Sequence, residues 1–93
     1  SSDLTFASLG QRDGFIEAAR GLLGSRSWVA RWIAAETMGV LSAKSEAAKV
    51  AELADDKTRL AGYWGDQKDV PKAQRKPEPT LGQRAAEIAA KLR

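Results

Sequence analysis

The residues with the clearest chemical meaning are three arginines and two serines gathered in one short stretch. Between the glutamates at positions 17 and 36, the only charged side chains are Arg20, Arg26 and Arg31, and Ser25 and Ser27 flank the middle arginine. Arginine donates paired hydrogen bonds to phosphates and to guanine, and a serine hydroxyl can bond a phosphate or a base edge. This stretch is therefore locally positive and suited to contact with nucleic acid.

Catalysis and metal binding have much weaker support. The chain of 93 residues has no histidine and no cysteine. Histidine is the commonest general base, cysteine is the commonest activated nucleophile, and the two together are the usual ligands of zinc. The adjacent carboxylates Asp55 and Asp56 point about 100° apart if they lie on a helix, which is typical of a solvent-facing surface. We therefore expect a protein that is not an enzyme and that has no catalytic residue, no metal and no cofactor.

The spacing of apolar residues predicts an all-α fold that positions the arginines and serines. Apolar residues recur at three- and four-residue steps, and no segment alternates as a half-buried strand would. We expect helices over about 14–23, 26–38 and 43–64, with Asp13 capping the first and Ser25 or Ser27 the second. The expected end residues of these helices are Gly24, Gly39 and Gly65. Together they predict a three-helix core over residues 1–65, with an interior of Leu22, Leu23, Val29, Trp32, Ile33, Val50, Leu53, Leu60 and Trp64.

A proline-rich segment and a last helix follow this predicted core. Residues 66–79 contain Pro71, Pro77 and Pro79 and are expected to form a linker. Thr80 and Gln83 have the spacing of a capping box, so we expect an amphipathic helix over 80–93. A helix of about a dozen residues is marginal alone in water. Its apolar seam of Leu81, Ile88 and Leu92 therefore predicts a homo-oligomer formed through the C-terminal helix.

The positive charge of the chain lies mostly near its end. The net charge is +3, and the cationic and acidic residues of positions 1–64 balance. The excess comes from the linker and the last helix, where Lys72, Arg75 and Lys76 are the expected contacts to phosphate. An ordinary solvated linker that happens to be basic is the equally open alternative.

Residues 17–35, EAARGLLGSRSWVARWIAA, resemble the helix-turn-helix of excisionase-like and MerR-type DNA-binding proteins. The matching residues are Ser25, Arg26, Ser27, Val29, Arg31 and Trp32. The resemblance implies that the motif spans about 14–38 and that its second helix enters the major groove with the serines and arginines outward. A plain helical hairpin with a Gly-Ser turn is the alternative. The order of elements is also similar to that of phage small terminase subunits.

Two functions follow from these observations. The first is a cytoplasmic, non-enzymatic DNA-binding module of a phage or mobile element, with double-stranded DNA as its partner and no membrane contact. The second is a helical adaptor domain that presents tryptophans to a partner protein, because the predicted core is neutral and tryptophan is enriched in interface hot spots. Tryptophans at helical spacing, such as Trp28 and Trp32, more often fill a core, and the same applies to Trp64 at the end of the predicted third helix.

Overall fold

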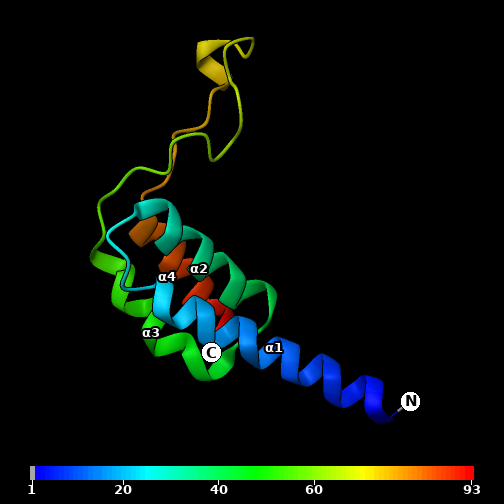
Figure 1. Ribbon diagram of the computed structural model, residues 1–93. Coiled ribbons are helices and arrows are strands. Elements are labelled where there is room, and N and C mark those ends of the chain that lie inside the picture. Colours follow the sequence, from blue (N-terminus) through cyan, green and yellow to red (C-terminus); the bar gives the residue numbers. More distant parts are fainter. Residues whose placement is uncertain (1) are drawn as a thin grey trace.

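The computed structural model describes the backbone of residues 2–93 and the side chains of residues 10–93. Over this range the predicted all-α class is confirmed, because the chain forms helices and no strand (Figure 1). The helices are α1 (Ser2–Leu22), α2 (Trp28–Val40), α3 (Ala47–Ala51) and α4 (Leu81–Leu92), with single 3-10 turns at Lys44–Glu46, Glu52–Asp55 and Lys72–Gln74. None of the described helices is both long enough and apolar enough to cross a membrane.

The first helix is longer than the sequence predicts, and the second lies two residues further along the chain than predicted. Helix α1 begins at Ser2, so Asp13 lies inside the helix and the prediction that it caps α1 is wrong. No proline precedes Asp13, so nothing prevents the helix from extending to these earlier residues. Ser27 caps α2, and its hydroxyl accepts a hydrogen bond from the Ala30 amide at 3.3 Å. Gly39 lies inside α2 rather than ending it. A Cβ at this position would be 3.2 Å from the side chain of Ile88 in α4, so the absence of a side chain lets the two helices approach closely. This glycine serves close helix packing.

The predicted long third helix over 43–64 is wrong. Only Ala47–Ala51 is α-helical, and the chain turns away after the 3-10 turn Glu52–Asp55. The Asp56 carboxylate accepts a hydrogen bond from the Thr58 amide at 2.9 Å, which gives the backbone an alternative to continuing the helix. The following residues then pair with the segment that leads into α4, through Leu60 N to Pro79 O at 2.9 Å and Leu81 N to Thr58 O at 2.7 Å.

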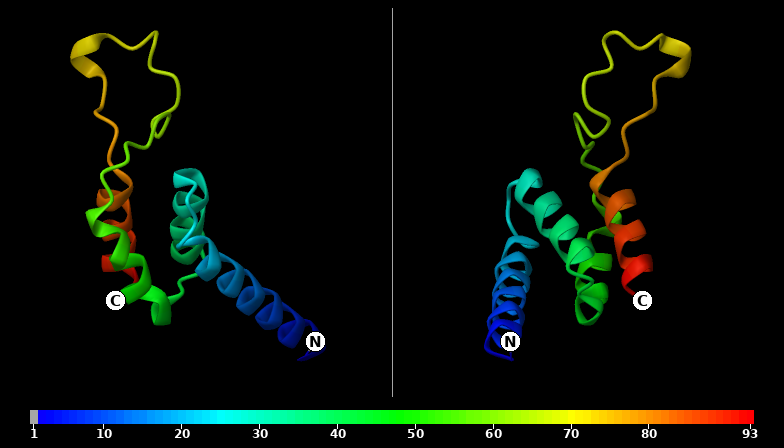
Figure 2. Two further views of the ribbon diagram at one scale, coloured as in Figure 1. Left: turned by 60° about the vertical axis from the view of Figure 1, so that its left-hand side comes forward. Right: turned by 90° about the vertical axis from the view of Figure 1, so that its right-hand side faces the viewer.

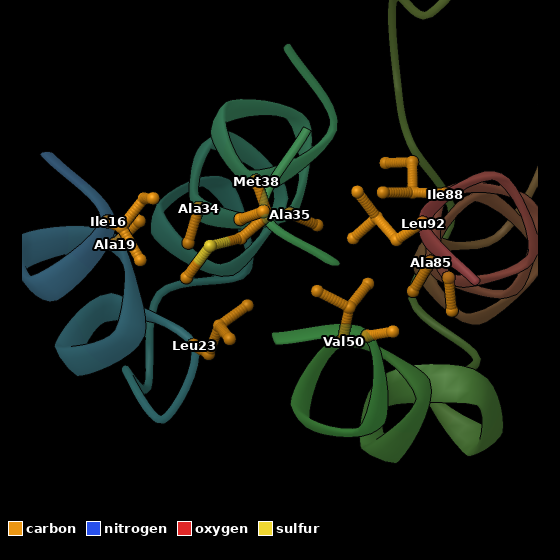
Figure 3. Packing of buried hydrophobic residues seen from close by; sticks show 13 residues of the cluster. Ile16, Ala19, Leu23, Ala34, Ala35, Met38, Val50, Ala85, Ile88 and Leu92 are labelled. Carbon is orange, nitrogen blue, oxygen red and sulfur yellow. The ribbon is translucent and has the colours of Figure 1, made fainter. Parts of the chain in front are cut away.

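The core lies between α1, α2, α3 and α4, whose buried side chains converge in Figure 3. Helix α4 contributes Ile88 and Leu92 to it, facing Ala35 of α2 and Val50 of α3. The last helix is therefore part of the core and not a separate unit beyond a linker. Four residues of the predicted interior are exposed instead: Leu22, Val29, Ile33 and Trp64.

Residues 61–79, called the arm below, leave the helical body as an extended loop (Figures 1 and 2). The prediction that 66–79 is not helical holds apart from the turn Lys72–Gln74. Both ends of the arm lie side by side, because Arg59 and Thr80 form an antiparallel bridge. Further out, the side chain of Gln67 bonds the backbone of Lys76 twice, at 3.0 and 3.2 Å. The arm is thus a closed excursion rather than a linker between two units.

Candidate functional site

The turn between α1 and α2 brings together three of the predicted DNA-contacting residues. Ser25 is half-buried, whereas Arg26 and Ser27 are exposed. The Ser25 hydroxyl accepts the Ser27 amide at 3.1 Å, so both serines are used to shape the turn and to cap α2. Arg26 forms no ion pair with any side chain among residues 10–93. Among the described side chains, the Arg26 guanidinium at the beginning of α2 is therefore free of a carboxylate partner.

Arg31 does not point outward, contrary to the expectation from the sequence. Its Nε donates to Asp56 Oδ2 at 3.1 Å and its Nη1 donates to the Ser25 carbonyl at 2.7 Å, with only 18% of the side chain exposed. Burial alone would raise the pKa of the Asp56 carboxyl, but hydrogen bonds from Thr58 and the charge of Arg31 outweigh it and lower that pKa. Arg31 ties α2 to the end of the 3-10 turn and is a structural residue.

Arg20 is also paired within the chain. Its Nε lies 3.1 Å from both carboxylate oxygens of Glu46, which is the buried charged residue at the start of α3. The hydrogen bonds from Arg20 hold the pKa of Glu46 below its ordinary value, so this carboxylate stays ionised. Two of the three arginines at the predicted DNA-contacting stretch are therefore neutralised by carboxylates more than twenty residues away.

The predicted phosphate contacts lie in the arm. Arg75 donates to the Val70 carbonyl at 2.8 Å and to the Lys68 carbonyl at 3.1 Å, and the Lys76 ammonium lies 4.6 Å from the centre of the Trp64 ring. Lys72 is exposed. Arg75 and Lys76 thus stabilise the arm itself, and neither forms an ion pair with a carboxylate of residues 10–93.

The predicted oligomerisation seam is already occupied inside the chain. Leu81, Ile88 and Leu92 are at most 3% exposed, because α4 packs on α2, α3 and the turn Glu52–Asp55 (Figure 3). Three prolines suggested that α4 stands apart, but the arm returns to its own starting point and places α4 in the core. This seam has no surface left to offer to another chain.

An exposed apolar surface lies on α1 and α2 instead. Phe15, Leu22, Val29, Ile33 and Val40 are between 42% and 82% exposed and are called the apolar face below. Between the two helices the face forms a groove of about 490 Å³. The lining side chains are Phe15, Trp32, Ile33, Glu36, Thr37, Val40 and Leu41. The two helices cross obliquely with opposite chain directions (Figure 2), and Arg12 of α1 donates to the Leu41 carbonyl at the end of α2 at 2.8 Å.

Helix α2 is apolar on two opposite sides, which explains why sequence reasoning missed this face. Ala34, Ala35 and Met38 point into the core, whereas Val29, Ile33 and Val40 form a second stripe on the other side. A helix that is apolar all round is normally buried all round. Both stripes can be seen in the sequence WVARWIAAETMGV. The prediction placed Val29 and Ile33 in the interior and did not recognise the opposite stripe of Ala34, Ala35 and Met38 as the buried one.

The charged residues of α2 are both paired within the chain. Besides Arg31, the helix has only Glu36, whose carboxylate accepts from Arg84 of α4 at 2.7 and 2.8 Å and from the Trp32 indole at 2.9 Å. The hydrogen bond from Arg84 lowers the pKa of Glu36, and the pKa of the Arg84 guanidinium is raised in return. The groove is therefore lined mostly by apolar groups, together with Thr37, whose hydroxyl donates to the Ile33 carbonyl, and one neutralised carboxylate.

The aromatic residues join α2 to the arm. The rings of Trp28 and Trp32 stack at 6.1 Å, Tyr63 stacks on Trp32 at 6.0 Å, and Trp64 meets Tyr63 edge-on at 4.7 Å. Because successive rings pack against one another, they do not enclose a ligand box, and the cluster lies beside the main core rather than in it. Their contribution is to hold the base of the arm against α2.

No group of three potential metal-ligating side chains occurs among the residues that the structure describes. The described residues thus offer an apolar groove and, at the beginning of α2, an arginine that makes no ion pair within residues 10–93. No protein-family model, curated protein or solved structure matches this chain.

Proposed function

We propose that this chain is a helical protein-binding module whose apolar face binds a helix of a partner. The observation that carries the proposal is that α2 has the composition of a buried helix, yet Ile33 and Val40 on one side of it are 54% and 82% exposed. Contiguous exposed apolar surface on a small protein marks an interaction site. Both ionisable residues of α2 are neutralised inside the chain, which further favours contact with an apolar surface.

The groove between α1 and α2 has the form that an amphipathic helix requires. Helix-in-groove recognition uses apolar anchors at three- and four-residue steps on the incoming helix. Fully burying one large apolar side chain contributes roughly 1.5 to 3 kcal/mol, and the apolar face contains five such side chains that are already partly buried. Covering the face therefore supplies a substantial part of the free energy of a specific complex.

The expected result is saturable binding of a model amphipathic helix, detected through Trp32 in the groove. In a Trp28→Phe, Trp64→Phe background, Trp32 is the only tryptophan, and its emission should change as a peptide of leucine, alanine and glutamine with heptad-spaced leucines is added. Ile33→Asp should weaken binding at least tenfold, because it places a charge in the apolar contact. Circular dichroism should show an unchanged fold, since Ile33 is exposed.

The matched control is Ala86→Asp, which places the same charge on the exposed side of α4. This variant should bind the peptide like the parent, and a scrambled peptide of equal composition should not bind. Equal affinities for the two aspartate variants, or no saturable change of Trp32 emission, would contradict a binding function of the apolar face.

DNA binding is a second candidate, and the free guanidinium of Arg26 at the N-terminal end of α2 favours it. Helix N-termini attract phosphate, and Arg26 has no carboxylate partner within residues 10–93. Arg26→Ala should weaken binding to mixed-sequence duplex by about 1 to 3 kcal/mol, measured by fluorescence anisotropy at two salt concentrations. Lys49→Ala on α3 is the matched loss of one exposed charge. No binding by the parent at low salt would remove DNA as a partner.

A further inference from the structure

The excess positive charge of the chain is concentrated in the outer part of the arm. Residues 67–76, called the outer loop below, have four cationic residues and one acidic residue, a net charge of +3: Lys68, Lys72, Arg75, Lys76 and Asp69. This equals the net charge of the whole chain, so the remaining residues balance. Because the outer loop projects away from the helices (Figure 1), the excess charge lies on one exposed element.

The carboxylates near the outer loop do not neutralise this charge. Glu78 Oε1 lies 3.3 Å from Arg59 Nε at the base of the arm, and Asp66 Oδ1 accepts the Lys68 amide at 2.9 Å. None of the four cations of the outer loop forms an ion pair with a carboxylate of residues 10–93. Like charges in one short loop repel one another, and a bound anion relieves this repulsion.

Hydrogen bonds within the outer loop fix its shape before any ligand binds. Gln67 closes the loop, since its Oε1 accepts the Lys76 amide at 3.0 Å and its Nε2 donates to the Lys76 carbonyl at 3.2 Å. Arg75 Nε braces the interior by donating to the Val70 carbonyl at 2.8 Å. A loop that already has its bound conformation loses less conformational entropy on binding.

The outer loop lacks the exposed apolar side chains that a protein or a membrane would contact. The large apolar side chains that are exposed among residues 10–93 all lie outside 67–76, and Val70 is half-buried. Protein interfaces are centred on aromatic and apolar anchors, and lysine is depleted there. Nucleic-acid backbones are instead bound by lysine and arginine through charge. The composition of the loop therefore favours phosphates of a nucleic acid.

We infer that the outer loop binds the phosphate backbone of a nucleic acid. Lys68 and Lys72 contact phosphates, whereas Arg75 and Lys76 add positive charge while they hold the loop together. Phosphate contacts carry no sequence information, so this binding is independent of sequence. The site is separate from the apolar face and from Arg26, and it does not rest on the proposed function.

The test is fluorescence anisotropy of a short labelled oligonucleotide of mixed sequence, single-stranded and as a duplex, with the full chain over a range of salt concentrations. The logarithm of the association constant should fall with that of the salt concentration. Four neutralised phosphates give a slope of roughly −2.8 on the single strand and roughly −3.6 on the duplex. Parallel titrations use poly-glutamate and vesicles that contain phosphatidylserine.

Charge reversal locates the site. Lys68→Glu, Lys72→Glu should weaken binding at least about tenfold, because carboxylates replace two exposed ammonium groups. The matched control is Lys44→Glu, Lys49→Glu, which gives the same net charge through exposed residues of the turn Lys44–Glu46 and α3, far from the outer loop (Figure 1). The control should bind close to the parent, and both variants should keep its helical circular dichroism.

Gln67→Ala separates the shape of the loop from its charge. It should weaken binding about three- to tenfold, because the loop must then be ordered on binding, while the salt slope stays the same. Ile33→Asp and Arg26→Ala should bind the oligonucleotide like the parent, since neither changes the outer loop.

Three results would overturn the inference. One is a parent that binds neither oligonucleotide, and another is equal binding by the two charge-reversal variants. The third is binding of poly-glutamate or of the vesicles at least as tight as that of the oligonucleotides, which would identify an acidic protein or a membrane as the partner. None of these results affects the apolar face, whose function is tested separately through Trp32.

Discussion

Deletion of residues 80–93 is expected to unfold the whole chain. Helix α4 supplies Leu81, Ile88 and Leu92 to the interior, together with Ala85 and Ala89, and each large side chain of this kind is worth roughly 2 to 5 kcal/mol when removed. The combined loss from these side chains is comparable to the whole free energy of unfolding of a typical domain, which is roughly 5 to 15 kcal/mol. Residues 1–79 should therefore show neither a cooperative thermal transition nor the helical circular dichroism of the full chain.

A graded version of this experiment uses single substitutions in α4. Ile88→Ala should lower the free energy of unfolding by about 2 to 5 kcal/mol, whereas Ala90→Ser on the exposed side should change it by less than about 1 kcal/mol. If residues 1–79 retain a cooperative transition with full helicity, α4 is peripheral, and its packing on α2 and α3 is not required for folding.

Gly82→Ala should be the most damaging change of a single atom. A Cβ on this residue would lie 2.6 Å from the Asp56 carbonyl oxygen and closer still to that of Ala54. Both are backbone atoms, and the Gly82 amide donates to the Asp56 carbonyl at 2.8 Å, so the two segments cannot separate without losing this bond. We expect a loss of about 3 kcal/mol or more in urea-induced unfolding.

The matched control is Gly10→Ala in α1, where a Cβ would meet no atom within 4 Å. The same substitution there should leave stability unchanged or raise it by up to about 1 kcal/mol, because alanine favours a helix. Similar effects of the two changes would mean that the start of α4 does not approach the 3-10 turn Glu52–Asp55 closely enough to exclude a methyl group.

The features that the sequence predicts correctly depend on neighbouring residues. Thr80 and Gln83 form both hydrogen bonds of the capping box, and Ser27 caps α2, because the bonding partners lie within three residues. The apolar repeats of α2 and α4 likewise identify these helices without knowledge of what covers them. The all-α class follows from the same short-range periodicity.

The wrong predictions depend on contacts between distant residues. Arg31 pairs with Asp56, which is 25 residues away, and Arg20 pairs with Glu46, which is 26 residues away. The residues next to either arginine in the sequence therefore give no sign that its charge is neutralised. The predicted third helix fails for a similar reason, since residues 58–60 pair with 79–81 across the whole arm. The position of α4 depends on this same closure.

The candidate site was predicted only in part. The turn with Arg26 was found because its residue types are unusual, whereas Phe15 and Val40 of the apolar face carry no chemistry of their own. An exposed apolar side chain cannot be told from a buried one until the neighbouring helices are placed. In α2, Met38 is buried in the cluster that the other helices complete, whereas Ile33 is left open.

The closed base of the arm has a consequence for how this chain can vary. The bridge between Arg59 and Thr80 joins the two ends of the arm, and Tyr63 packs on Trp32 near its base, whereas the outer turn Lys72–Gln74 lies away from the helices (Figure 1). Doubling the length of such a loop costs only about 0.6 kcal/mol in closure entropy. Insertions near Asp69 should therefore be tolerated far better than insertions elsewhere between α1 and α4. The arm is the part of the molecule where new sequence, and with it a new contact, can be added while the helices keep their arrangement.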